Sequence, residues 1–120
     1  MSTLVFEQPL PGLAPHTVYN LDPVEGADGV FSLRPTEAPD VRLFVLDASL
    51  YAPSYAPDVA DHRAQIGLER DEPARTLVVA TPGEAGTSVN LAAPVLVNEA
   101  EGRAVQAILE DWPLRAPLGV

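Results

Sequence analysis

The 120-residue sequence contains neither cysteine nor lysine. Without cysteine, disulfide bridges, thiolate metal sites and cysteine nucleophiles are excluded. All seven basic side chains are arginine, against seventeen acidic ones, so the formal net charge is −10. A chain of that charge repels phosphate backbones and anionic membrane surfaces. We therefore expect no direct contact with nucleic acid and none with membranes.

Long apolar runs are also missing. No stretch approaches the roughly 20 apolar residues that a membrane-spanning helix requires. Residues 1–12 show no basic region followed by an apolar run, so they do not read as a signal peptide. These absences predict a cytoplasmic protein. The apolar fraction of 47% is ordinary for a globular chain, and the length suits one domain, which we expect to span 1–120.

Residues with catalytic chemistry are few. The sequence has two histidines, no glycine-rich phosphate loop, and no serine in a nucleophile-elbow context. We therefore expect no enzyme activity, no catalytic residue and no cofactor. One alternative stays open, a metal-dependent enzyme: on a helix Asp58 and His62 would share a face, with Asp61 beside them. Because the sequence places no third ligand, a solvated helix face is favoured, and no metal site is expected.

Prolines and glycines divide the chain into short segments, several of which alternate between apolar and polar residues. This pattern predicts a mainly β fold, a small antiparallel barrel-like or sandwich domain of about seven to nine short strands. The expected strands are 3–7, 17–21, 30–33, 41–46, 75–82, 87–92, 94–98 and 103–109. Segment 58–67 lacks alternation and predicts one short helix, capped by Asp58 and ended by Gly67. The tail after 109 is expected to be irregular.

The run "TSVNLAAPVLVN" (87–98) carries no charge in an otherwise acidic chain. We interpret it as two strand segments that are covered on both faces. Pro94 cannot donate to a ladder, so it belongs at the break or at the start of the second strand. The amides of Asn90 and Asn98 are expected to satisfy backbone groups near this break. The alternative is a small-molecule-binding β-barrel in which Asn90, Asn98 and Gln106 line a pocket.

Aromatic residues gather in two places. Tyr51 and Tyr55 lie in "DASLYAPSYAPD", a loop stiffened by proline, and Trp112 lies in "LEDWPLR". Such rings either cover the edge of the core or form a protein-contact patch. Interface anchors are commonly aromatic and ringed by charge that steers a partner. On that basis the candidate partner-binding residues are Tyr51, Tyr55, Asp58, Glu110, Asp111 and Trp112.

The order of several motifs resembles the bacterial flagellar assembly factor W (FliW) family. The matching segments are "FEQPLPGL" (6–13), "FSLRPTEAPDVRLFVLDASLYAPSY" (31–55), and "VNLAAPVLVN" (89–98) followed by "AVQAIL" (104–109). The last two are the most distinctive, and they contain the structural signature residues Asn90, Pro94, Asn98 and Gln106. Ala48, the Arg34–Pro35 step and Trp112 depart from the usual pattern. The resemblance covers about residues 4–118.

This resemblance implies a mostly antiparallel, barrel-like β fold with a short helix and a non-enzymatic role. Members of the family bind CsrA, a small RNA-binding translational repressor, and block its action on flagellin messenger RNA. They also bind flagellin, so that free flagellin releases the repressor. For this chain the resemblance therefore implies two protein partners, a CsrA-type regulator and flagellin.

Overall fold

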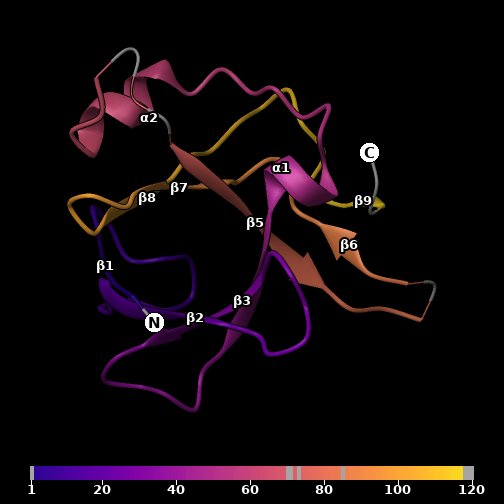
Figure 1. Ribbon diagram of the computed structural model, residues 1–120, viewed down its shortest axis with the longest axis horizontal. Coiled ribbons are helices and arrows are strands. Elements are labelled where there is room, and N and C mark those ends of the chain that lie inside the picture. Colours follow the sequence, from indigo (N-terminus) through magenta and orange to yellow (C-terminus); the bar gives the residue numbers. More distant parts are fainter. Residues whose placement is uncertain (1, 70–71, 73, 85, 118–120) are drawn as a thin grey trace.

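The computed structural model describes residues 2–69, 72, 74–84 and 86–117, and within them the chain forms nine strands and two short helices (Figure 1). The predicted mainly β fold is confirmed. The helices are α1 (Ala48–Tyr51) and α2 (Ala60–Gln65). The strands are β1 (Ser2–Phe6), β2 (Val18–Pro23), β3 (Val30–Pro35), β4 (Leu43–Asp47), β5 (Arg75–Thr81), β6 (Ser88–Val89), β7 (Val95–Asn98), β8 (Arg103–Gln106) and β9 (Ala116–Pro117).

Seven of these strands close into a barrel. They follow the order β4-β3-β2-β1-β8-β7-β5, and pairing of β4 with β5 closes the ring. β6 and β9 continue from β5 outside the barrel. Among the described pairings, β1 with β8 is the one parallel pair, so the antiparallel prediction is wrong at this seam. The two strands are far apart in sequence, and no hairpin turn dictates their relative direction.

Alternation along the strands fills the barrel with apolar side chains. Leu4 and Phe6 of β1 meet Tyr19 and Leu21 of β2 there, as their spacing predicts, and the Phe6 and Tyr19 rings contact edge to face at 5.0 Å. Because side chains on one strand face recur every second residue, each strand contributes in the same way. The other buried members are Leu10, Leu33, Val45, Leu77, Val95, Val97 and Ala104.

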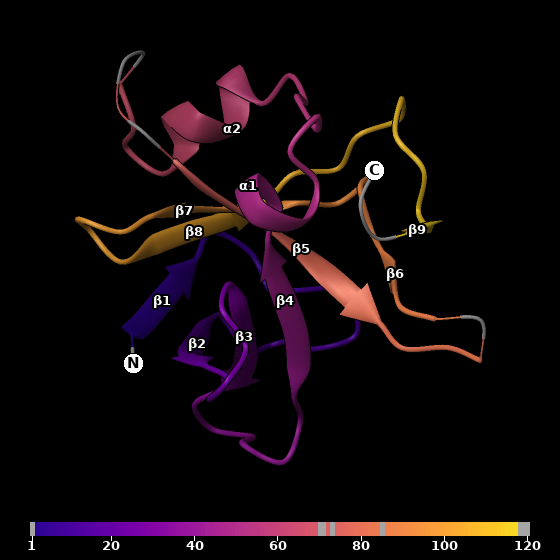
Figure 2. The same cartoon turned by 45° about the vertical axis from the view of Figure 1, so that its right-hand side comes forward.

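Two smaller apolar clusters lie on the outside of the barrel. One joins α1 and the outer face of β4 and β5 to β6 and β9, with Leu46, Val78, Val89 and Leu91 among its members. The other joins Ile66 and Leu68, which follow α2, to Leu96 of β7 and Val105 of β8, and Figure 2 shows α2 above the β7–β8 hairpin. The helices therefore cover only one side of the barrel. No helix in the described ranges is long and apolar enough to cross a membrane.

The helices differ from the single one predicted over 58–67. α2 is shorter, and Val59 rather than Asp58 occupies its N-cap position, without a side-chain cap. Asp58 precedes the N-cap position by one residue, and its carboxylate accepts a hydrogen bond from the Ala60 amide at 3.4 Å. Gly67 follows the helix with a φ of +79°, as predicted. The additional helix α1 has a single turn, too short to show a periodic pattern.

The uncharged run also differs in detail, since only Ser88–Val89 of the predicted strand 87–92 pairs. Ala80 pairs with Val89 and Leu77 with Val95, so two residues of β5 lie opposite five residues, 90–94. The excess forms a bulge that ends at Pro94, which has no amide hydrogen to place in a ladder. The tail is not wholly irregular, because β9 pairs with β6.

Candidate functional site

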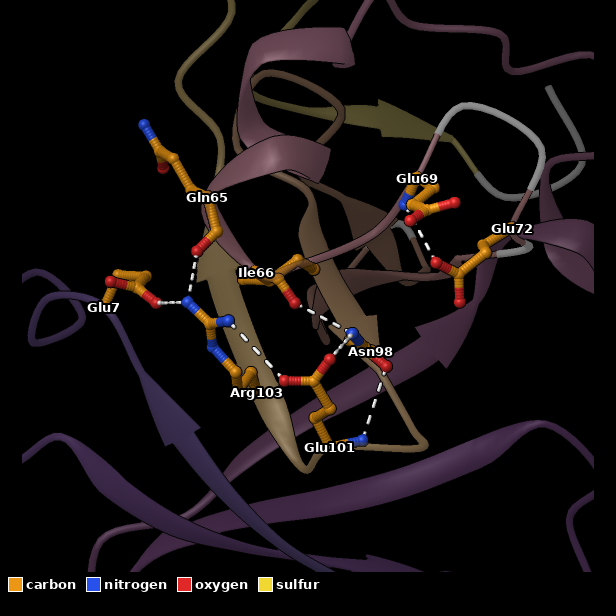
Figure 3. Close-up of polar contacts among 8 residues, drawn as sticks. All are labelled: Glu7, Gln65, Ile66, Glu69, Glu72, Asn98, Glu101 and Arg103. Atoms are coloured by element: carbon orange, nitrogen blue, oxygen red, sulfur yellow. Dashed lines mark hydrogen bonds and ion pairs between the residues drawn. The ribbon is translucent and has the colours of Figure 1, made fainter.

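Asn98 ties the uncharged run to α2. Every residue from 91 to 98 is buried. The Asn98 Nδ2 donates to the Ile66 carbonyl at 2.8 Å, and its Oδ1 accepts from the Glu101 amide at 3.4 Å (Figure 3). A buried amide left without partners would cost about 1–3 kcal/mol. The side chain is therefore a connection between the end of α2 and the β7–β8 turn.

The expectation that Asn98 bonds to backbone groups near the break is therefore wrong, but the other signature residues do bond to the backbone around the bulge. Asn90 Oδ1 accepts from the Ala92 amide at 2.9 Å, and Gln106 Nε2 donates to the Ala93 carbonyl at 3.2 Å. The Pro94 carbonyl accepts from the Ala107 amide at 2.9 Å. Among the described residues, Asn98 lines a surface groove next to Tyr55 and Arg75, whereas Gln106 lines a different groove next to Glu7 and His62. The three amides thus stabilise an irregular backbone rather than line one common pocket.

Arg103 adds a second connection beside Asn98. Its guanidinium contacts Glu7 at 2.8 Å, donates to the Gln65 carbonyl at 2.5 Å, and lies 3.6 Å from Glu101 (Figure 3). The hydrogen bond to Glu7 is the main cause that raises the pKa of Arg103. This arginine joins the end of β1, the C-terminal end of α2 and the β7–β8 turn. It was not among the sequence candidates, because no local pattern brings these three segments together.

The candidate aromatic residues meet on one surface. Tyr51 and Tyr55 follow from α1 and the loop after it, and both rings pack with Trp112 against the cluster outside the barrel. The Tyr51 hydroxyl donates to the Asp28 carbonyl at 2.7 Å, and the Tyr55 hydroxyl donates to the Leu91 carbonyl at 2.5 Å. The Tyr55 and Trp112 rings meet edge to face, with centroids 4.6 Å apart. Burial raises the pKa of Tyr55 to about 12.

Carboxylates occupy the surroundings of these rings. Glu110 and Asp111 are exposed immediately before Trp112, and Asp58 is exposed just before α2. The three rings remain partly accessible, so a partner could contact the rings and the carboxylates together. We call Tyr51, Tyr55, Glu110, Asp111 and Trp112 the acidic aromatic surface. Asp58 lies on the same chain segment as the tyrosines, three residues after Tyr55.

A groove of about 550 Å³ adjoins this surface and includes Tyr55 among its lining residues. Ala48, Ala52 and Leu68 give it apolar lining, and carboxylates come from three separate segments: Asp47, Glu72 and Glu99. Arg75 also lines the groove, 3.2 Å from Glu99 and 4.0 Å from Asp47. Its guanidinium also lies 5.1 Å from the centre of the Phe31 ring. Sequence reasoning missed these groove residues, because only the closed barrel brings the end of β4 and the β7–β8 turn to the start of β5.

The described residues around His62 do not form the metal site that the enzyme alternative requires. Among the described residues, no group of three or more His, Asp or Glu side chains is placed to hold a metal ion. His62 lies within α2 and Asp58 before it, so the helical spacing assumed for this pair does not apply. The His62 Nδ1 is buried and has no hydrogen-bond partner in the described part of the chain.

Taken together, the fold and the surface define a small closed β-barrel protein. Its interior is filled by side chains, and its accessible features are grooves and a charged aromatic surface that suit contact with other proteins.

Comparisons with known proteins give the family. The sequence profile described as "FliW protein" matches residues 1–118. A flagellar assembly factor FliW of Syntrophotalea carbinolica is 34% identical over 94 residues, which are 74% of this chain and 66% of that protein. One of an Exiguobacterium species is 30% identical over 122 residues, covering 98% of this chain and 83% of that protein. The chain therefore belongs to the FliW family.

A solved structure agrees on the fold. The crystal structure described as that of the flagellar assembly factor FliW superimposes with a TM-score of 0.86. It covers 97% of this chain and 84% of its own, at 21% sequence identity. At that identity the likeness concerns the barrel architecture alone.

Proposed function

We propose that this protein is a flagellar assembly factor that acts by binding other proteins and not by catalysis. The observation that carries the proposal is membership of the FliW family over residues 1–118. Relatives aligned over most of this chain are named flagellar assembly factors. The filled barrel and the absence of a metal-binding group among the described residues are compatible with this role.

Its partners in this proposal are a CsrA-type translational repressor and flagellin. The protein binds the repressor and prevents its action on flagellin messenger RNA, and free flagellin takes the protein away from the repressor. A repressor that binds RNA must present cationic side chains to the phosphates. A protein of net charge −10 complements such a partner and speeds the encounter.

The acidic aromatic surface is the proposed contact with the repressor. Tyr55 and Trp112 offer apolar rings held in place by packing and a hydrogen bond. Glu110 and Asp111 supply exposed charge at their edge. Bound beside an RNA site, these carboxylates would repel the incoming phosphate backbone even without covering the site. Reversal of several acids to lysine should therefore weaken displacement of RNA.

A partner-switching assay tests the proposal. The host's CsrA-type repressor is bound to a labelled leader of flagellin messenger RNA, and the fraction of bound RNA is followed by fluorescence anisotropy. Added protein should release the RNA, and purified flagellin added next should restore RNA binding. If RNA stays bound in low salt with the protein in excess, antagonism is wrong. If flagellin does not restore binding, the exchange step is wrong.

A further inference from the structure

Apart from the end near α1, where Val30 and Leu46 belong to the cluster outside the barrel, the outer face of strands β1 to β4 is a second surface of the molecule, distinct from the acidic aromatic one. Both helices lie on the other side of the barrel, away from β2 and β3 (Figures 1 and 2). Apolar side chains are accessible here: Val5 is 50% exposed and Val18 is 36% exposed, and the two residues pair across β1 and β2. This face is thus open to a partner.

The strand register arranges polar side chains in a row across this face. Thr3 pairs with Asn20, and Asn20 pairs with Arg34. The β3–β4 ladder runs through Ser32 with Phe44 and Leu33 with Leu43, so the next position opposite Arg34 is Arg42. Because strand side chains alternate, these four residues share the outer face. The guanidinium of Arg42 lies 4.7 Å above the Phe44 ring, which places it on that face as well.

The two arginines of this row have no carboxylate partner. Arg75 and Arg103, elsewhere on the barrel, are each within 4.0 Å of two acids. No ion pair in the described ranges involves Arg34 or Arg42, and the Nε of Arg34 is buried without a hydrogen-bond partner. Like charges directly opposite each other destabilise a sheet. The placement of two of the few cations of this acidic chain side by side therefore costs stability, and we take it as a sign that this face has a binding role.

We propose that this face binds a carboxylate-bearing segment of a partner protein. Arg34 and Arg42 offer guanidinium donors, Asn20 adds its amide NH₂ while its Oδ1 accepts from Thr3, and Arg can hold a carboxylate through two parallel hydrogen bonds. The Arg42 guanidinium lies over the Phe44 ring, and the attraction between the cation and the ring face helps to hold it on this surface. Val5 and Val18 on one side and Phe44 on the other provide apolar contact beside the charge.

This inference goes beyond the proposed function and does not depend on it. The acidic aromatic surface complements a basic partner, whereas the arginine row complements an acidic one. The two surfaces lie on different sides of the barrel, so one protein molecule could hold both kinds of partner. A peptide titration uses neither the repressor nor flagellin, so its outcome is independent of whether the proposed function holds.

The experiment is a nuclear magnetic resonance titration of the ¹⁵N-labelled protein with an acetylated octapeptide of alternating Glu and Val. Amide shifts should move and saturate at Asn20, Arg34 and Phe44, and the Nε–H signals of Arg34 and Arg42 should move with them. The variant Arg42→Glu should weaken peptide binding by about tenfold or more, since it removes one pairing charge and adds repulsion. It should keep the fold, because it places opposite charges across β3 and β4.

Arg115→Glu is the matched control. Arg115 is exposed in the segment before β9 and carries the same change of charge. The affinity of the Arg115→Glu variant for the peptide should stay within about twofold of that of the parent protein at moderate salt, because distant surface charges are screened. An octapeptide of alternating Lys and Val should not bind this face. Four results would overturn the proposal: no saturable shifts in low salt, shifts centred on α1 or α2, equal binding of the lysine peptide, or self-association of the chain through this face.

Discussion

The Tyr55 hydroxyl donates a hydrogen bond of 2.5 Å to the carbonyl of Leu91, 36 residues further along the chain. This bond joins the loop after α1 to the bulge between β6 and β7. The Trp112 ring packs edge to face on the same tyrosine. The uncharged signature run and the acidic aromatic surface are therefore one structural unit, in which the bulge positions the partly exposed rings.

Removal of the Tyr55 hydroxyl tests that connection. Tyr55→Phe leaves the partly buried Leu91 carbonyl without its donor, so the free energy of unfolding should fall by about 1–2 kcal/mol. The ring and its contact with Trp112 remain. Tyr51→Phe is the control, because its bond to Asp28 is exposed to water and should be worth less than about 1 kcal/mol. Urea unfolding followed by circular dichroism measures both, and equal losses would show that the Leu91 bond is not special.

The stability of the parent protein should depend on Tyr55 in alkaline solution. Burial raises the pKa of Tyr55 to about 12, above the ordinary value of 10.0. The folded state thus holds this proton more tightly than the unfolded state does. The contribution is present below pH 10 and is lost as the pH rises toward 12. The difference in unfolding free energy between the parent and Tyr55→Phe should shrink over that interval. A constant difference from pH 9 to pH 12 would contradict the assigned burial.

Some of the fold could be predicted from the sequence because its cause is local. The alternation in "TLVFE" places Leu4 and Phe6 inside, and Gly67 marks the end of a helix by its positive φ. Within the charge-free run 87–98, Val89 and residues 91–98 are buried, as the absence of charge predicts, whereas Thr87, Ser88 and Asn90 stay partly exposed. Such patterns need only neighbouring residues. The parallel β1–β8 pair and the contacts of Arg103 were not predicted, because they depend on closure of the barrel, which no local pattern encodes.

The candidate site shows the same division. Tyr51, Tyr55 and Trp112 could be selected by residue type, but their packing on one cluster depends on the fold. Arg75 and Glu99 were missed because they meet only where β5 passes the β7–β8 turn. The Arg34–Arg42 pair was missed for a similar reason, since it follows from the β3–β4 register. The helix α1 was not predicted, because it is a single turn capped by Asp47 and is too short to show a helical period of apolar residues.

Gly67→Ala tests the connection between α2 and β8. A residue with a side chain is strained at the φ of +79° found here, by about 1–2 kcal/mol. An added Cβ would also lie 2.9 Å from Arg103 Nη1 and 3.1 Å from Glu101 Oε2. Gly12→Ala is the control, because Gly12 has a similar φ of +78° and no atom within 4 Å of the added Cβ. The melting temperature should fall further for Gly67→Ala than for Gly12→Ala. Equal falls would show that crowding against Arg103 adds nothing to the backbone strain.

Asn98→Ala tests the buried amide. The substitution leaves the Ile66 carbonyl and the Glu101 amide without their partner, so a loss of about 1–3 kcal/mol is expected. Hydrogen exchange of the α2 amides should accelerate as well, because the helix loses an anchor. Asn20→Ala is the control, since its bond to Thr3 is exposed and its removal should change stability by less than about 0.5 kcal/mol. Unchanged exchange in α2 would show that Asn98 does not hold the helix.

The central claim is that the acidic aromatic surface binds the basic repressor, and calorimetric titration of the host's CsrA-type repressor tests it most directly. The double variant Glu110→Lys with Asp111→Lys should raise the dissociation constant by about tenfold or more. The control, Glu37→Lys with Asp40→Lys, makes the same change of net charge at exposed positions in the β3–β4 loop. The control should bind within about threefold of the parent at moderate salt. Equal weakening by both pairs, or no measurable binding of the parent protein, would contradict the claim.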